Sequence, residues 1–179
     1  MDRRQFLATS GAAAIAAATP RAFAQAGADD ARLSATFAAI FDRQLDLSPA
    51  FVTSLGLDKG ARAGAKSLLD DNSKSAMMKR LAATQAAIKE LAGYNNASLS
   101  DAQRLNLDVI LYALDQQTVA PAKFGLNSAV RPYRIFQQGG SYFSTPDFLN
   151  TAHTINATAD CDAYVARLEA FARNLRTDT

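Results

Sequence analysis

The sequence predicts an all-α fold, a helical bundle of about four long and two short helices with one long aromatic loop, within a larger mainly helical fold. Apolar residues recur at three- and four-residue spacing in separate stretches, which is typical of amphipathic helices. Ser, Pro and Gly stand where these stretches begin and end. No segment shows the sustained alternation of a strand, and a few residues around Ile135 are the one strand candidate.

Four stretches before residue 125 predict helices. The first begins at Ala31 and carries apolar residues up to Leu45, and a short one begins at Ser48-Pro49. Residues 57–66 contain two glycines and charged residues and predict a surface loop. The third helix begins after Asp71 or Ser73 and buries the apolar residues Met77, Leu81, Ile88 and Leu91.

The fourth helix opens with a capping box, in which Ser100 precedes Gln103 by three positions. Its apolar face contains Leu107 and Leu114. Pro121 lacks an N–H and clashes with the preceding turn, so it either ends or kinks this helix. We expect the helix to end near Ala120.

The aromatic loop follows, and it contains the candidate binding residues. Pro132 favours an extended backbone up to Phe136, and the adjacent glycines allow a tight turn. Together with His153, the loop residues that could line a site are Tyr133, Gln137, Gly139, Gly140 and Tyr142. The alternative is that the rings seal the core, in which case at least two of Tyr133, Phe136, Tyr142 and Phe143 are buried.

Two helices are expected after the loop. Ser144-Thr145-Pro146 provides a hydroxyl cap followed by proline, which predicts a helix start. Thr158 is the expected cap of the last helix. Its predicted buried stripe consists of apolar residues at helical spacing, namely Tyr164, Val165, Leu168, Phe171 and Leu175.

The first 24 residues are typical of a twin-arginine export signal. Arg3 and Arg4 precede Phe6 and Leu7, and an Ala-rich apolar run follows that is shorter than the ~20 residues needed to cross a bilayer. Small residues at Ala22 and Ala24 predict cleavage before Gln25. We therefore expect a periplasmic or secreted protein, an encounter with the export machinery, and no stable membrane span after cleavage. Residues 25–30 predict a small-residue linker, and residues 31–179 the helical region.

The charge balance argues against one class of partner. Three arginines and one aspartate of the chain's 19 basic and 17 acidic residues lie in positions 1–24, which leaves 16 of each in the remainder. A neutral body offers no electrostatic surface for nucleic acid.

The loop and the helices after it resemble a bacterial family known as domain of unknown function 885. The resemblance rests on the order of several short segments rather than on any single one. They are Pro132-Tyr133, Gln137, Gly139 or Gly140, Tyr142, Pro146, Phe148-Leu149, His153, Ile155, Asp162-Ala163 and Tyr164–Leu168 with Arg167. Members are longer and are grouped by resemblance with zinc metallopeptidases through a distant H-E-x-x-H motif. The resemblance implies that this chain is a C-terminally incomplete, non-catalytic N-terminal portion, whose partners are the missing portion and a peptide-like substrate.

The residues themselves predict no catalytic site. Catalytic zinc needs about three protein ligands, whereas His153 and Cys161 are the chain's one histidine and one cysteine. We expect no cofactor in this chain, zinc belonging to a full-length relative. Asp70-Asp71 and Asp160 with Asp162 precede or open helices, where capping explains them. A non-enzymatic interaction module of the cell envelope is the alternative to a hydrolase.

Overall fold

The computed structural model describes residues 20–178, with side chains from Gly27 onward, and confirms the all-α fold. Four long and two short α-helices lie in this part of the chain, as the sequence predicts. Two 3-10 helices accompany them. In order, the elements are α2 (Pro20–Leu45), α3 (Pro49–Ser54), η1 (Gly60–Ser67), α4 (Lys74–Leu91), η2 (Asn96–Ser98), α5 (Asp101–Phe124), α6 (Ser141–Thr151) and α7 (Thr158–Asp178).

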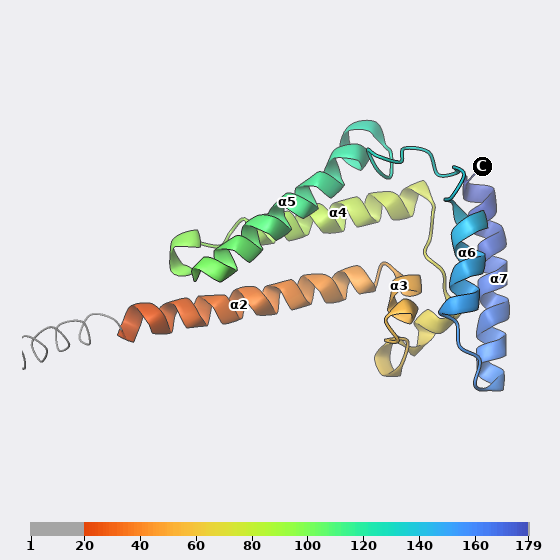
Figure 1. Ribbon diagram of the computed structural model, residues 1–179, viewed down its shortest axis with the longest axis horizontal. Coiled ribbons are helices and arrows are strands. Elements are labelled where there is room, and N and C mark those ends of the chain that lie inside the picture. Colours follow the sequence, from red (N-terminus) through yellow and green to blue (C-terminus); the bar gives the residue numbers. More distant parts are fainter. Residues whose placement is uncertain (1–19, 179) are drawn as a thin grey trace, which may run out of the picture.

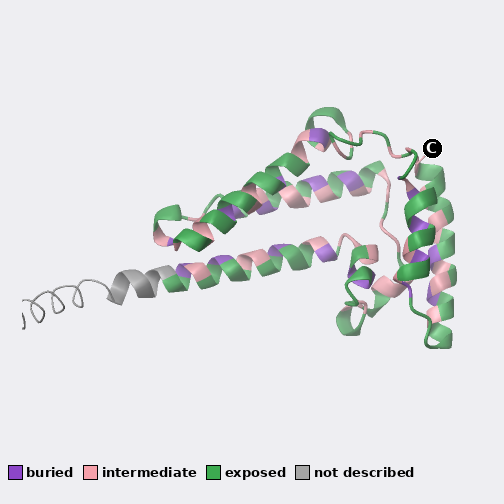
Figure 2. Ribbon diagram, viewed as in Figure 1, coloured by how far each residue is buried: buried purple, intermediate pink, exposed green. Residues whose placement is uncertain are grey.

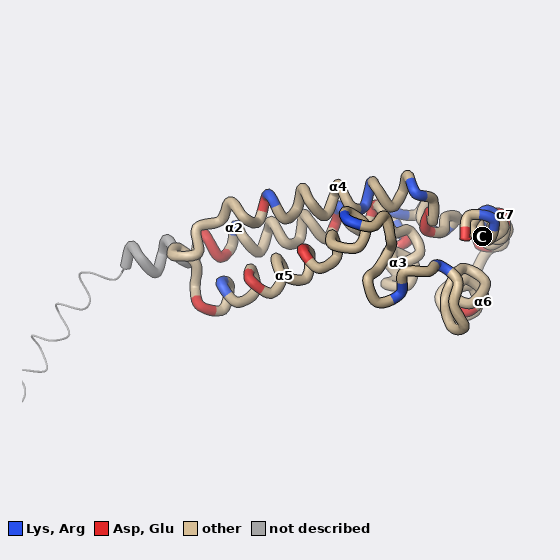
Figure 3. Tube along the Cα trace, turned by 90° about the horizontal axis from the view of Figure 1, so that it is seen from above, with Lys and Arg blue, Asp and Glu red and all other residues tan. Residues whose placement is uncertain are grey.

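Helices α2, α4 and α5 form the first of two packed groups and run lengthwise through the molecule (Figure 1). Their apolar stripes meet in the main core, and buried residues follow their facing sides (Figure 2). This core consists of Leu33, Ile40, Ala87, Leu91, Leu99, Leu107 and Leu114. Charged residues of both signs are spread along the three helices (Figure 3).

The second group consists of α3, η1, α6 and α7 at the other end of the molecule. Helices α6 and α7 lie side by side and run steeply across the direction of α2, α4 and α5 (Figure 1). Helix α7 contacts both α6 and η1. Residues 68–73 connect η1 to α4, so this segment joins the two groups.

Helix α2 begins before the predicted start. The linker expected at residues 25–30 is wrong, because α2 is already helical from Pro20. Two aspartates hold this segment in place: the buried Asp29 pairs with Arg32 at 3.3 Å. Asp30 accepts a hydrogen bond from the backbone N–H of Ser100 at 3.0 Å. Asp30 thus takes the place in the α5 capping box that the side chain of Gln103 was expected to fill.

Helix α5 continues past its proline. The end predicted near Ala120 is wrong, because the helix reaches Phe124 with Pro121 inside it. Proline removes only one helical N–H, and the carbonyl oxygens of Ala120 and Pro121 still accept from Leu126 and Gly125. Gly125 has φ +65°, the left-handed conformation that ends helices and favours glycine.

Three other segments also differ from the prediction. The strand candidate around Ile135 is not a strand: within residues 20–178 there is only an isolated bridge between Phe136 and Gly139. The surface loop expected at residues 57–66 is in part η1. Helix α6 begins at Ser141 instead of after Ser144, because a distant carboxylate binds the Ser141 N–H.

Helix α7 turns a different face to the protein than its apolar pattern indicates. Val165, Leu168 and Leu175 of the predicted buried stripe are exposed. The buried positions of the helix are instead Ala163 and Arg167, one helical turn apart. A small side chain beside a long one lets α7 approach its neighbours while the arginine reaches into them.

No helix in the described part of the chain has both the length and the apolar character needed to cross a membrane.

Candidate functional site

Arg167 is the most deeply buried polar residue of the second group. Its relative exposure is 0%. The backbone of α7 places it opposite α3, η1 and the turn between α6 and α7, so that its guanidinium group meets all three. We call Arg167 and its hydrogen-bond partners the arginine hub.

The guanidinium donates to four acceptors in the hub. Nε donates to the Leu68 carbonyl at 2.9 Å, and Nη2 donates to the Ala65 carbonyl at 3.0 Å and to Thr53 Oγ1 at 2.6 Å. The fourth contact joins Nη1 to His153 Nδ1 at 2.6 Å. The guanidinium carbon also lies 4.8 Å from the centre of the Phe148 ring. These contacts tie α7 to α3, to the η1 region and to α6.

The hub determines the tautomer of His153. Arginine can only donate, so Nδ1 of His153 is the acceptor and its proton is on Nε2. Nε2 then donates to the Asp160 carbonyl at 3.0 Å. Both ring nitrogens are therefore occupied.

Burial lowers the pKa of Arg167, while the carboxylates of Asp58 and Asp70 oppose this effect by charge. Neither carboxylate forms an ion pair with Arg167 within the described residues. Carbonyl and hydroxyl dipoles and a neutral imidazole therefore solvate the buried cation.

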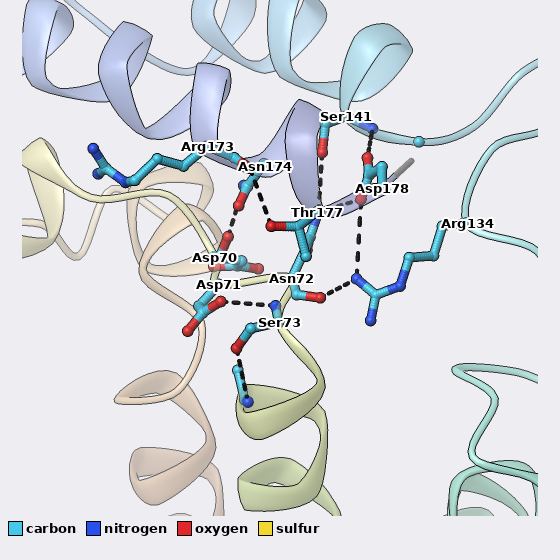
Figure 4. A network of polar contacts seen from close by, with 12 residues as sticks. Asp70, Asp71, Asn72, Ser73, Arg134, Ser141, Arg173, Asn174, Thr177 and Asp178 are labelled. Carbon is cyan, nitrogen blue, oxygen red and sulfur yellow. Dashed lines mark hydrogen bonds and ion pairs between the residues drawn. The ribbon is translucent and has the colours of Figure 1, made fainter.

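A second polar cluster joins residues 70–73 to the start of α6 and the last turn of α7, and we call it the helix junction (Figure 4). Asp178, whose side chain is 3% exposed, accepts from the Ser141 backbone N–H at 2.8 Å. Asn72 donates to Asp178 at 3.2 Å and to Ser141 Oγ at 2.9 Å. Arg134 donates to the Asn72 carbonyl, and its guanidinium lies 3.9 Å from Asp178.

Three carboxylates near the junction bind helix N-termini. Asp178 binds that of α6, Asp71 accepts from Ser73 N–H at 2.7 Å before α4, and Asp70 accepts from Ala50 N–H at 3.0 Å in α3. Capping explains Asp71 as predicted, whereas Asp70 caps α3, which lies earlier in the chain than the helix that Asp70 precedes. Asp70 differs from Asp71 in its surroundings, because burial raises the pKa of Asp70 while the Ala50 N–H lowers it.

Two adjoining pockets flank the junction and share Asn72, Ser141 and Ser144. The first, about 260 Å³, contains Asp70, Asn174 and Phe148 in its lining. The second, about 180 Å³, is lined mainly by polar residues that include Arg134, Asp178 and Gly140.

The start of α7 depends on Asp160, not on the expected cap Thr158. Its carboxylate accepts from the backbone N–H groups of Asn156 and Ala157 and pairs with Lys66 at 2.6 Å. The hydrogen bond from Lys66, followed by that from Asn156, lowers the pKa of Asp160 to about 2. This contact links α7 to η1 close to His153.

The aromatic loop is an exposed segment that holds its own turn together. Tyr133, Tyr142 and Phe143 are 78%, 44% and 50% exposed, so the alternative prediction that the rings seal the core is wrong. The hydroxyl of Tyr142 bonds the carbonyls of Phe136 and Gln137, each at 2.8 Å.

The two glycines are required by close approaches within the turn. A Cβ on Gly139 would lie 1.9 Å from Cζ of Phe136. Gly140 has φ +103° and lies immediately before α6.

The predicted site residues do not form one group. Gly140 lines the smaller pocket, Tyr133 and Gln137 are exposed, and His153 belongs to the separate arginine hub. Arg3, Arg4, Phe6 and Leu7 lie outside the described residues. Ala22, Ala24 and Gln25 lie in the first turns of α2.

Sequence reasoning assigned no role to Asp178, Asn72 or Arg167. Arg167 lies in one of the segments that carry the family resemblance. Its position one helical turn after the small residue Ala163 is the sequence feature that could have indicated a shared buried face. Nothing local marks Asp178, because its partner Ser141 is 37 residues away.

The described residues do not form a zinc site. No three His, Cys, Asp or Glu side chains among them are grouped so that they could hold a metal ion. Cys161 is exposed, and both nitrogens of His153 have partners.

These observations define an all-α protein whose second group of helices is held by a buried arginine and by carboxylate caps. The family model for bacterial proteins of unknown function designated DUF885 matches residues 49–179, and the chain belongs to this family. The match includes the arginine hub and the helix junction. No curated protein and no solved structure is significantly similar to the chain.

Proposed function

We propose that this chain is an exported member of the DUF885 family and forms the non-catalytic helical portion of a zinc-dependent hydrolase that acts on peptide-like substrates. The observation that carries the proposal is that the side chains of His153 and Arg167 are taken up by internal hydrogen bonds. Both residues belong to the segments that carry the family resemblance. They are hydrogen-bonded to each other, and each also donates to a backbone carbonyl. Groups with every polar atom bonded internally hold helices in place, which is the role of a scaffold.

The proposed function is tested by measuring peptide hydrolysis. Protein expressed from the complete gene is expected to hydrolyse unstructured peptides, to lose that activity with a chelator and to regain it with zinc. A matched preparation of residues 25–179 is expected to show no hydrolysis. Absence of chelator-sensitive hydrolysis in the complete product would contradict the proposal.

Export is tested separately. The signal-like residues 1–24 support the twin-arginine route, with cleavage between Ala24 and Gln25. Replacing Arg3 and Arg4 together by Lys is expected to leave uncleaved precursor in the cytoplasm, measured by fractionation and mass spectrometry. Normal periplasmic delivery of that double variant would overturn the route.

Exposed apolar faces favour a second candidate, a non-enzymatic interaction module of the cell envelope. Leu105, Val109 and Tyr112 lie at helical spacing on one exposed face of α5. If this function holds, a substitution such as Val109→Glu abolishes a specific association without affecting hydrolysis. The peptide assay described above distinguishes the two functions.

A further inference from the structure

The larger pocket beside the helix junction contains several hydrogen-bond acceptors in its lining. Asn174 Nδ2 donates to the Asp70 backbone carbonyl at 2.9 Å. Asn72 Nδ2 donates to Asp178 Oδ1 and Ser141 Oγ. Because a carbonyl and a carboxylate accept but cannot donate, these contacts fix both amide orientations. The oxygen of each amide is left without a donor among the described residues.

Asp70 adds a charged acceptor to the same pocket. One carboxylate oxygen accepts from Ala50 N–H at 3.0 Å, and no described residue donates to the other. No Lys or Arg side chain of the described part forms an ion pair with Asp70, although the charges of Arg80 and Arg167 act on it from a distance. The carboxylate therefore lacks a bound counter-ion. Figure 4 shows Asp70 in the segment 70–73, near Asn72 and near Asn174 of α7.

The rest of the lining limits what can bind. The Ser144 hydroxyl donates to the Gly140 carbonyl at 3.0 Å, so the hydroxyl oxygen can still accept a hydrogen bond. Leu69 and Phe148 supply apolar walls. The volume of about 260 Å³ lies just below the ~300 Å³ at which pockets for drug-sized ligands begin. The pocket is thus small, rich in acceptors, negatively charged and partly apolar.

We propose that this pocket binds a primary ammonium group with a short aliphatic body. An ammonium has three donors and no acceptor, which complements the Asp70 carboxylate and the two amide oxygens. The aliphatic carbons contact Leu69 and Phe148. Calcium fits less well, since it takes six to eight oxygen ligands and Asp70 is the pocket's one carboxylate. The inference goes beyond the proposed function and does not depend on hydrolase activity.

The test uses n-butylammonium chloride as probe, titrated into the purified chain and followed by calorimetry. Asp70→Asn keeps an oxygen for the Ala50 N–H but removes the charge, and Asp71→Asn changes the neighbouring carboxylate, which caps α4 outside the pocket. We expect saturable binding to the wild type, weakened about tenfold or more in Asp70→Asn and changed less than about twofold in Asp71→Asn. A thermal melt of each variant verifies that it is folded.

Two further probes separate the ligand chemistries. 1-Butanol has the same body without charge, and butyltrimethylammonium keeps the charge without N–H donors. We expect neither to compete with butylammonium, and calcium chloride not to displace it. Absence of saturable butylammonium binding, equal binding to Asp70→Asn, or displacement by 1-butanol, butyltrimethylammonium or calcium at equal concentration would each overturn the proposal.

Discussion

Asp178 in the last turn of α7 accepts a 2.8 Å hydrogen bond from the backbone N–H of Ser141, the first residue of α6. This contact joins the beginning of one helix to the end of its neighbour. A carboxylate at a helix N-terminus satisfies an N–H that has no partner in the helix and interacts favourably with the helix dipole. At this end α6 and α7 are therefore joined by a direct hydrogen bond.

Asp178→Ala is expected to lower the free energy of unfolding by about 1 kcal/mol, because it removes this cap and leaves the Asn72 amide without one acceptor. Chemical denaturation measures the change. Glu169→Ala removes an exposed carboxylate from the same helix and is expected to stay within about 0.5 kcal/mol of the wild type. Equal effects of the two substitutions would contradict the role given to Asp178.

Arg167→Met is expected to cost about 3 kcal/mol or more. It leaves two carbonyls, a hydroxyl and an imidazole nitrogen buried without their donor. Arg173→Met, the same change at an exposed position of α7, is expected to be nearly neutral. A stable Arg167→Met variant with an unchanged denaturation midpoint would show that the hub does not hold the helices.

Asp160 is expected to make the stability of the fold depend on pH in the acid range. Its folded-state pKa of about 2 lies below the unfolded value of 3.8, so its stabilising effect is present above about pH 4 and is lost as the pH falls towards 2. Asp160→Asn is expected to melt below the wild type at pH 7, with the difference shrinking across that range. Asp162→Asn, at an exposed neighbour, is the control. A difference in Tm that stays constant from pH 7 to pH 2 would refute this assignment.

The effect of Asp70 on stability is expected to depend on pH in the opposite direction. Burial raises its folded-state pKa above the unfolded value of 3.8, so ionised Asp70 opposes folding, and stability falls as the pH rises through the interval between the two values. Asp70→Asn is expected to melt at or above the wild-type Tm at pH 7. Asp71→Asn is expected to melt below it, because the Ser73 N–H lowers the pKa of Asp71. Melting curves at pH 7 and pH 3 measure both variants. A higher Tm for Asp71→Asn than for Asp70→Asn at pH 7 would contradict the opposite roles given to the two carboxylates.

The sequence predicted those features that depend on neighbours within one or two helical turns. The apolar spacing of Leu107 and Leu114 placed the core face of α5, and Ser73 and Ser100 are the caps expected of them. The DUF885 resemblance was also visible in ordered short segments and is confirmed by the family match.

Other features depend on residues far apart in the chain, which local patterns do not specify. The start of α6 is set by Asp178, and the buried face of α7 is set by the partners of Arg167 on α3 and η1. An apolar stripe indicates burial only where another element covers it, and Val165 and Leu168 remain exposed. The pocket acceptors are likewise defined by where the Asn72 and Asn174 amides donate.

The zinc content of purified residues 25–179, measured per chain by elemental analysis after dialysis against metal-free buffer, tests the scaffold assignment most directly. The arginine hub occupies both nitrogens of His153, and the described residues group no metal-ligand set. We expect far less than one zinc per chain. One tightly held zinc per chain would contradict the scaffold assignment.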